Sequence, residues 1–209
     1  MTRERLLEDV RRYYEATLAR HGATPRGVDW NSGESQTLRF QQLAKIIDGP
    51  SASVLDFGCG YGALCAYLRD AGHVGEYVGF DLSDEMLAAA RTSSAICPRC
   101  RYTSDQEGLQ PADYVVASGV FNVKLRTPDD EWNAYMRDTM RYMASLARRG
   151  LAFNALTKYS DPEFRRPDLY YADPLEFFDF CQRELSRHVA LLHDYPLYEF
   201  TILVRRQGH

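Results

Sequence analysis

The segment 56–62 concentrates glycine at Gly58, Gly60 and Gly62, directly after a short apolar run. Glycine allows backbone conformations, and a close approach to a ligand, that a Cβ atom would block. Asp81 follows Gly62 by 19 residues and ends the next apolar run, where a carboxylate can accept hydrogen bonds from two ribose hydroxyls. A glycine-rich turn followed by such an acid predicts a nucleoside-binding site. A tight turn that binds no ligand is the alternative.

The glycine spacing alone is compatible with two classes of nucleoside ligand. Gly58, Gly60 and Ala63 satisfy the dinucleotide fingerprint G-x-G-x-x-G/A, so an NAD-dependent oxidoreductase is one interpretation. Asp56 lies two positions before Gly58, and a carboxylate there suits a ligand with an ammonium group better than one with two phosphates. A chain of 209 residues also leaves little room for a separate substrate domain. The residues therefore favour a ligand without a pyrophosphate.

The elements that must position these residues alternate between strand and helix after residue 50. Apolar runs predict strands over 53–57, 76–81, 101–103, 113–118, 150–156, 189–193 and 198–204. The last two runs are too close together for a crossover helix, so we expect them to pair antiparallel. The pattern predicts an α/β fold: a Rossmann-like seven-stranded, mostly parallel sheet with an antiparallel last strand and helices on both faces.

Helices are expected between these strands and before them. Ser83 and Asp173 are predicted N-caps, and Thr127 is expected to cap a helix with Pro128 at its first position. Two amphipathic helices, over about 1–20 and 34–48, form an N-terminal helical extension. We therefore expect one domain over 1–209, with 1–50 as a helical lid or extension and 51–209 as the α/β core.

The composition limits which binding partners and which cellular compartment are expected for the protein. The net charge is −4 with no basic stripe, so no nucleic-acid partner is expected. No apolar run is long enough to span a membrane and no signal peptide is visible, which predicts a cytoplasmic protein. Five cysteines, an odd number, predict reduced thiols. Cys97 and Cys100 have the spacing of half a zinc knuckle, but no second pair follows, so no metal site is predicted.

Three segments resemble, in the family's order, motifs of class I S-adenosylmethionine-dependent methyltransferases. They are 54–62, which contains the glycine turn, 77–87, which contains Asp81, and 112–121, which contains the fourth predicted strand. The resemblance implies S-adenosylmethionine as the cofactor. It implies methyl transfer to an oxygen or nitrogen acceptor, less readily to carbon, on a small molecule. A non-catalytic module that binds the cofactor remains a further alternative, and the sequence leaves the oligomeric state open.

The resemblance also implies roles for single residues. Gly58, Cys59 and Gly60 would lie against the methionine part of the cofactor, and Asp56 would orient the loop and the cofactor's amino group. Asp81 would hold the ribose hydroxyls. The remaining implied contacts are to the adenine, from Leu82, Met86, Ser104 and Asp105, and to the methionine moiety, from the backbone of Ser118 and Gly119.

Trp30 and Arg39 have a spacing, Trp-x8-Arg, similar to that of glycine N-methyltransferase-like enzymes, where such a segment covers the cofactor. Arg39 would then bind the cofactor's carboxylate in a bidentate manner, and Trp30 would shield the sulfonium. The alternative is that Trp30 packs against an N-terminal helix while Arg39 forms a surface ion pair.

Methyl transfer depends on alignment of nucleophile, methyl carbon and sulfur, and a base is needed only where the acceptor must lose a proton. Candidates for a base or an orienting group should lie beyond the carboxyl ends of the strands. The polar and aromatic residues expected there include Tyr159, Tyr170, Tyr171 and His193. The alternative is that these residues only complete loops and a hairpin.

Overall fold

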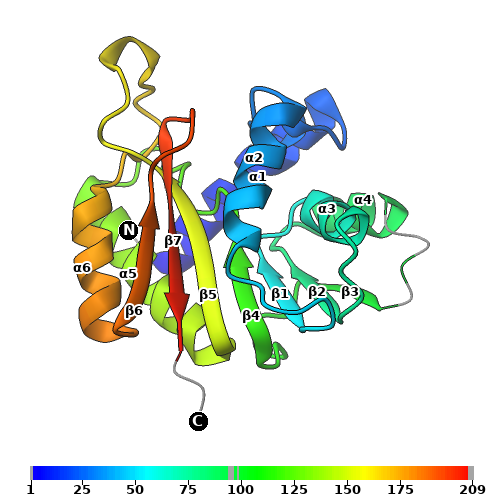
Figure 1. Ribbon diagram of the computed structural model, residues 1–209. Coiled ribbons are helices and arrows are strands. Elements are labelled where there is room, and N and C mark those ends of the chain that lie inside the picture. Colours follow the sequence, from blue (N-terminus) through cyan, green and yellow to red (C-terminus); the bar gives the residue numbers. More distant parts are fainter. Residues whose placement is uncertain (1, 94–96, 98, 207–209) are drawn as a thin grey trace.

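The computed structural model describes residues 2–93, 97 and 99–206 and contains one seven-stranded sheet (Figure 1). The strand order is β3-β2-β1-β4-β5-β7-β6. The strands are β1 (Val54–Phe57), β2 (Tyr77–Phe80), β3 (Cys100–Thr103), β4 (Ala112–Ala117), β5 (Ala147–Leu156), β6 (His188–Leu192) and β7 (Glu199–Arg205). β7 runs antiparallel to both of its neighbours, whereas the other observed pairings are parallel. The predicted Rossmann-like sheet with an antiparallel last strand is confirmed.

Helices cover both faces of the sheet. The described helices are α1 (Arg3–His21), α2 (Gly33–Ala44), α3 (Ala63–Asp70), α4 (Asp84–Ser93), α5 (Asp129–Leu146) and α6 (Pro174–Glu184), with short 3-10 turns η1 (Pro25–Val28) and η2 (Pro162–Phe164). Apolar residues of α2, α3 and α4 pack on one face, and those of α5 and α6 pack on the other. Among the described residues, every helix is too short or too polar to cross a bilayer.

The strand register places the residues of the glycine turn beside Asp81. β1 is buried along its whole length between β2 and β4, as expected for a central strand covered on both faces. Phe57, the last residue of β1, pairs with Phe80, the last residue of β2. Because the two strands are parallel and end together, Gly58 and Asp81 emerge side by side at the carboxyl edge of the sheet.

Two predicted helix caps are confirmed, and Thr2 caps α1 in the same way. The hydroxyl of Thr2 accepts a hydrogen bond from the backbone N–H of Arg5, and the hydroxyl of Ser83 accepts one from Met86 N–H at 3.2 Å. Asp173 accepts one from Leu175 N–H at 3.0 Å. Each bond satisfies a donor that the first helical turn leaves without a partner.

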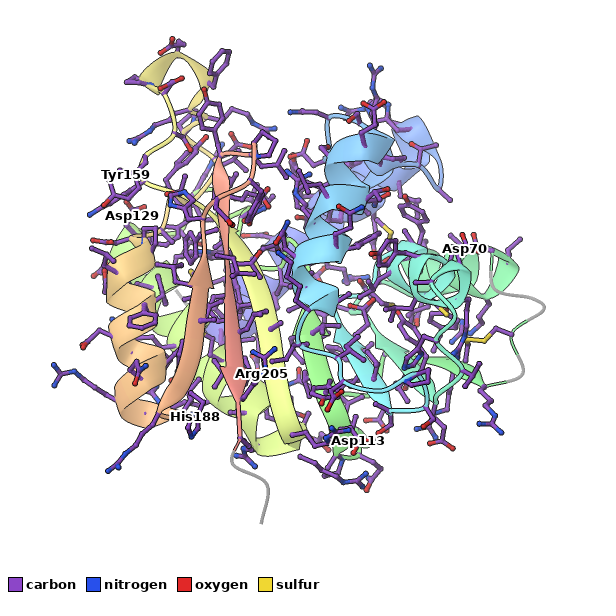
Figure 2. The ribbon with its side chains drawn as sticks, in the orientation of Figure 1. Asp70, Asp113, Asp129, Tyr159, His188 and Arg205 are labelled. Atoms are coloured by element: carbon purple, nitrogen blue, oxygen red, sulfur yellow. A yellow bond between two sulfur atoms is a disulfide. The ribbon has the colours of Figure 1, made fainter. Side chains whose placement is uncertain are left out.

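Three expectations about local structure are wrong. α5 begins at Asp129 with Pro128 in the capping position, one residue later than expected, and no side chain caps the helix, while Thr127 is buried and its N–H closes a turn onto Lys124 O. α2 ends at Ala44, before the expected Asp48, because the chain turns there and buries Ile46 against the sheet. Cys97 and Cys100 form a disulfide instead of reduced thiols (Figure 2).

Candidate functional site

The glycine turn takes a conformation that suits glycine. Gly58 and Gly60 have positive φ angles of 80° and 53°. A Cβ atom on Gly58 would lie 2.4 Å from a methyl group of Val120. Two consecutive N–H groups, of Gly58 and Cys59, donate to the carbonyl of Phe80 at 2.7 and 2.9 Å and tie the turn to the end of β2. A larger side chain is therefore excluded at Gly58 by sterics.

The carboxylate of Asp81 links the glycine turn to the start of α4. It accepts hydrogen bonds from the N–H of Gly60 at 2.8 Å and from the N–H of Ser83 at 3.0 Å. Burial raises the pKa of Asp81, although the hydrogen bonds from Ser83 and Gly60 oppose that rise. A carboxylate oxygen has more than one lone pair, so each oxygen can still accept a hydroxyl from a ligand in the crevice.

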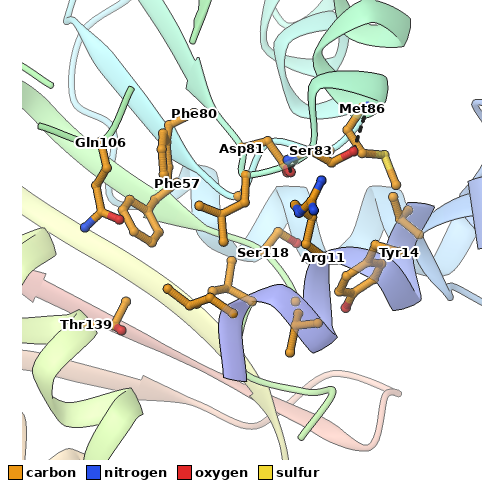
Figure 3. Close-up of a pocket in the computed structure, with 18 of the residues that line it drawn as sticks. Arg11, Tyr14, Phe57, Phe80, Asp81, Ser83, Met86, Gln106, Ser118 and Thr139 are labelled. Carbon is orange, nitrogen blue, oxygen red and sulfur yellow. Dashed lines mark hydrogen bonds between the residues drawn. The ribbon is translucent and has the colours of Figure 1, made fainter. Parts of the chain in front are cut away.

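A crevice opens at this edge of the sheet between the strand ends and α1 (Figure 3). Eight of the predicted cofactor residues line it together: Trp30, Gly58, Gly60, Asp81, Leu82, Met86, Ser118 and Gly119. The opposite wall comes from α1, whose Arg3, Leu7, Val10, Arg11 and Tyr14 face the crevice. The structure thus brings the predicted cofactor residues of four separate segments together with α1 in one predominantly apolar binding site.

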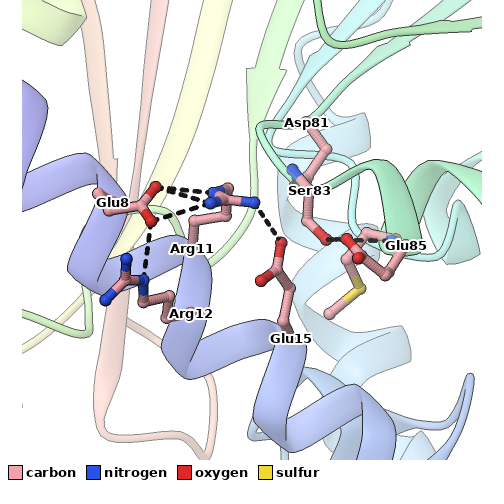
Figure 4. A network of polar contacts seen from close by, with 8 residues as sticks. Glu8, Arg11, Arg12, Glu15, Asp81, Ser83 and Glu85 are labelled. Atoms are coloured by element: carbon pink, nitrogen blue, oxygen red, sulfur yellow. Dashed lines mark hydrogen bonds and ion pairs between the residues drawn. The ribbon is translucent and has the colours of Figure 1, made fainter.

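A network of charged residues orders the face of α1 that looks onto Asp81 and Ser83 (Figure 4). Arg11 bonds Glu8, one turn before it, and Glu15, one turn after it, at 2.8 and 2.9 Å. Pairs at these spacings lie on one side of a helix and stabilise it. The network therefore fixes the guanidinium of Arg11 at the mouth of the crevice.

The inner end of the crevice continues into a recess lined by Asp56, Cys59 and Ser118, among others. Asp56 is 2% exposed and accepts a hydrogen bond from the hydroxyl of Tyr77 through one oxygen. Its other oxygen, Oδ1, has no partner among the described residues, and neither has the buried hydroxyl of Ser118. Burial raises the pKa of Asp56 to about 7, with Tyr77 opposing the rise. Buried polar atoms without partners are costly, and these two suit a polar ligand such as an ammonium group.

Trp30 and Arg39 stack on each other beside this recess. The guanidinium carbon of Arg39 lies 3.9 Å from the centre of the Trp30 ring. A Cβ atom on Gly119 would lie 2.5 Å from the same indole. The lack of a side chain at Gly119 therefore allows Trp30 to lie over the end of β4.

Arg39 is also paired with Glu199, the first residue of β7. Its Nη2 lies 2.6 Å from one Glu199 carboxylate oxygen, and Nε lies 2.8 Å from the other. The two side chains are 8% and 1% exposed, so the expectation of a surface ion pair is wrong. Nη1 of Arg39 remains buried without a partner, which leaves one cationic donor for a ligand carboxylate.

The structure places Ser104 and Asp105 differently from the other predicted contacts. Both are exposed, and Asp105 accepts a hydrogen bond from the N–H of Gly108 within a turn. Gln106, the next residue, lines the crevice instead. No sequence signal singled out Gln106, because the position after a short edge strand depends on the turn that follows.

A second cavity, of about 810 Å³, adjoins the crevice and shares Tyr14, Val28 and Trp30 with it. It is lined mainly by the segments that follow β4, β5 and β6, and by Arg39 and Glu199. We call it the acceptor cavity. Its size lies in the range of small-molecule sites.

Of the four catalytic candidates, only Tyr171 lines the acceptor cavity. Its hydroxyl accepts a hydrogen bond from the N–H of Arg166 at 2.8 Å. Tyr159 (Figure 2) and His193 are exposed, and their rings contact each other at a tilt, with centres 5.9 Å apart. Tyr170 packs into the core and accepts a hydrogen bond from Asn133.

Among the residues of the acceptor cavity, Tyr14 and Glu199 were not singled out by the sequence interpretation, whereas Tyr195 lies beside His193 in the segment between the last two strands, where an orienting group was expected. Glu199 is fully buried and accepts hydrogen bonds from Asn154 and from Arg39. A single acid directly before the apolar run 200–204 was the available signal for it. Burial raises the pKa of both Tyr14 and Tyr195, so both remain neutral phenols at physiological pH.

The structure resembles solved methyltransferases. The magnesium protoporphyrin IX methyltransferase of Synechocystis PCC 6803, crystallised with bound S-adenosylmethionine, superimposes with a TM-score of 0.62 over 96% of both chains, at 18% identity. At this identity the likeness shows a shared fold.

The sequence matches known relatives more directly. Residues 55–153 match the model of a methyltransferase domain. The protein Rv1506c of Mycobacterium tuberculosis, which carries the name of a methyltransferase, is 49% identical over 154 residues, which are 74% of this chain and 93% of the relative. A malonyl-[acyl-carrier protein] O-methyltransferase of Enterobacter lignolyticus is 33% identical over 59% of this chain, and the match spans about half of that relative's length (47%). Together with the crevice, these matches show that the chain belongs to the methyltransferase family.

Proposed function

We propose that the protein binds S-adenosylmethionine in the crevice and transfers its methyl group to an oxygen or nitrogen atom of a small molecule in the acceptor cavity. The observation that carries the proposal is a set of buried polar atoms without partners: Asp56 Oδ1, Ser118 Oγ and Arg39 Nη1. They border the inner crevice or its junction with the acceptor cavity. An aminoacyl group, with its ammonium and carboxylate, offers the partners that these atoms lack.

Each residue has a defined part in this proposal. Asp56 and Ser118 hold the ammonium group, Arg39 binds the carboxylate, and Asp81 accepts the ribose hydroxyls. Leu82, Met86 and Gln106 border the adenine. When bound, the cofactor supplies a methyl carbon already activated by its sulfonium, so that the protein must chiefly align the acceptor and exclude water.

The junction between crevice and acceptor cavity is where the acceptor would meet the methyl group. Trp30 and Tyr14 line both spaces, and an aromatic face near the sulfonium favours its positive charge. Tyr171 and Tyr195 border the cavity with phenol hydroxyls that can orient an acceptor by hydrogen bonding. Residues 1–50 act as a lid on the core 51–209 in this proposal.

The cofactor assignment is tested by thermal unfolding with S-adenosylhomocysteine and, separately, with NAD. A ligand present at 100 times its dissociation constant adds about 2.7 kcal/mol to the free energy of unfolding. We expect this stabilisation with S-adenosylhomocysteine and none with NAD. Stabilisation by NAD alone would replace the proposal with the oxidoreductase interpretation.

The transfer itself is tested by incubating the protein and a metabolite extract with cofactor labelled in the methyl group. We expect label to appear in a small molecule. His193→Gln should leave the rate unchanged because His193 lies outside the cavity lining, whereas Tyr171→Phe should lower it. Cofactor binding without label transfer to any acceptor would indicate a non-catalytic module.

A further inference from the structure

Three of the five cysteines gather at the edge of the sheet away from the acceptor cavity. Cys65 lies on α3, Cys97 follows α4, and Cys100 begins β3. Their sulfur atoms all lie within 4.8 Å of one another, and Cys65 Sγ is 3.0 Å from Cys100 Sγ. The sequence pointed only to the pair Cys97 and Cys100. The fold adds Cys65, which is 32 residues from Cys97 in the chain.

Arg69 lies against this cluster. It is one helical turn after Cys65, on the same side of α3. Its Nε donates to Cys97 Sγ at 3.2 Å and its Nη2 lies 3.4 Å from Cys100 Sγ. The carbonyls of His73 and Gly75, at 2.6 and 2.8 Å, hold the guanidinium in place. A fixed cation at this distance favours thiolates over thiols.

We propose that Cys65, Cys97 and Cys100, in their reduced form, bind a thiophilic divalent cation, with zinc as the best match. An ion bound tetrahedrally at about 2.3 Å from each thiolate holds the sulfur atoms about 3.8 Å apart, so three sulfur atoms that already lie within 4.8 Å of one another need only a small adjustment once the disulfide is open. Three thiolates carry three negative charges, which the divalent ion and Arg69 together neutralise. N–H groups that donate to coordinating sulfur are the kind of outer contact that stabilises such sites.

The fourth position of the ion is left to a water molecule. Cys65 is buried, but Cys97 and Cys100 are only partly so, which gives solvent access to one side. Open coordination of this kind makes the ion exchangeable, in contrast to a closed four-cysteine site.

The disulfide between Cys97 and Cys100 makes the site dependent on redox state, because it occupies two of the three ligands. A dithiol reductant opens it by transferring two electrons and two protons, and itself becomes a disulfide. The ion then displaces the protons from the three thiols as it binds. Oxidation of the two thiols by a disulfide oxidant reverses the exchange and releases the ion.

The test uses the full chain, reduced with dithiothreitol, freed of reductant and of metal without air, and titrated with Zn²⁺ or with Co²⁺ as a spectroscopic probe. We expect one ion per chain and the absorption of a tetrahedral thiolate cobalt complex. Cys65→Ser and the double variant Cys97→Ser/Cys100→Ser should weaken binding roughly 100-fold or more. Protein left in the disulfide form should bind no ion.

Cys181→Ser is the matched control, because Cys181 is also a buried cysteine but lies on α6, in the other core cluster. It should bind the ion like the unaltered chain. Far-ultraviolet circular dichroism checks that each variant is folded. If Cys65→Ser fails to fold, the double variant still tests the site, because it alters only partly buried sulfur atoms. No stoichiometric uptake by the reduced chain, or equal binding by a folded Cys65→Ser variant, would overturn the proposal.

Discussion

The two carboxylates of the crevice, Asp81 and the buried Asp56, differ in the partners that they already have. Asp81 accepts backbone hydrogen bonds through both oxygens, whereas Asp56 has one oxygen bonded to Tyr77 and one without a partner. Asp81 is therefore fixed by the protein before any ligand arrives. Asp56 completes its hydrogen bonding only with a ligand, which gives the two residues separate experimental signatures.

Asp81→Asn tests the first of these roles. The amide keeps the shape of the side chain but cannot accept both backbone N–H groups and two hydroxyls at once. We expect the dissociation constant of S-adenosylhomocysteine to rise at least ten-fold, about 1.4 kcal/mol, in titration calorimetry. Asp84→Asn, three residues later and exposed, is the control and should bind as before. Unchanged affinity in Asp81→Asn would remove this carboxylate from the site.

Asp56 makes stability depend on pH in the absence of ligand. Its pKa in the folded protein is about 7, raised by burial from an ordinary value of 3.8. Between these values the folded state holds a proton that the unfolded chain has lost. The contribution of Asp56 to the free energy of unfolding therefore decreases as pH rises from about 4 to about 7. In urea unfolding of the ligand-free protein, the Asp56→Asn variant should no longer show this decrease of the free energy of unfolding with pH. The Asp70→Asn variant, altered at an exposed residue, should still show it.

Cofactor binding should show the opposite trend with pH. An ammonium group favours the ionised form of Asp56, so binding releases a proton and the affinity rises with pH up to about 7. Tyr77→Phe removes the hydrogen bond that lowers this pKa, and should move the inflection to higher pH. Calorimetry in buffers of different ionisation enthalpy measures the released proton. A flat profile would show that Asp56 does not meet a charged group.

At the scale of elements, α1 lines the site but contributes few buried side chains to the core. Only Leu6 and Thr17 of its 19 residues are buried, yet five of its side chains line the crevice. Amphipathic spacing predicted this helix from the sequence. Its position over the crevice could not be predicted, because it depends on contacts with segments distant in the chain, among them α4 and the core residues around Leu6.

A paired substitution on α1 tests its role as a lid. Leu7→Ala with Val10→Ala removes apolar surface that faces the crevice without altering a buried core residue. We expect roughly ten-fold faster dissociation of S-adenosylhomocysteine in stopped-flow experiments, from the loss of apolar contact. Arg12→Ala, whose side chain is 70% exposed, is the control. Equal rates in the two variants would mean that α1 does not cover the ligand.

At the scale of the molecule, local patterns predicted the sheet and the cofactor crevice well, and the acceptor cavity poorly. The glycine turn and Asp81 follow directly from adjacent parallel strands, so their meeting was predictable from the order of the motifs. Tyr14, Tyr195 and Glu199 come from three distant segments, and only the tertiary structure brings them together. Tyr159 and His193 follow the correct strands but point to the outer side, which a strand-end argument cannot distinguish.

The ion pair of Arg39 and Glu199 joins residues 160 positions apart, and connects the N-terminal extension to the antiparallel end of the sheet. Because both side chains are buried, removing the arginine leaves a carboxylate without its counter-charge in a region of low polarity. Such losses cost about 3–5 kcal/mol.

Arg149 and Asp48 form a second pair over a long sequence separation, with side chains 45% and 85% exposed, and exposed pairs contribute about 0–1 kcal/mol. We therefore expect Arg39→Ala to lower the free energy of unfolding by several kcal/mol in urea titrations and Arg149→Ala to change it little. If the two variants lost equal stability, the extension would not be anchored through this pair, and Arg39 would be free to serve the ligand alone.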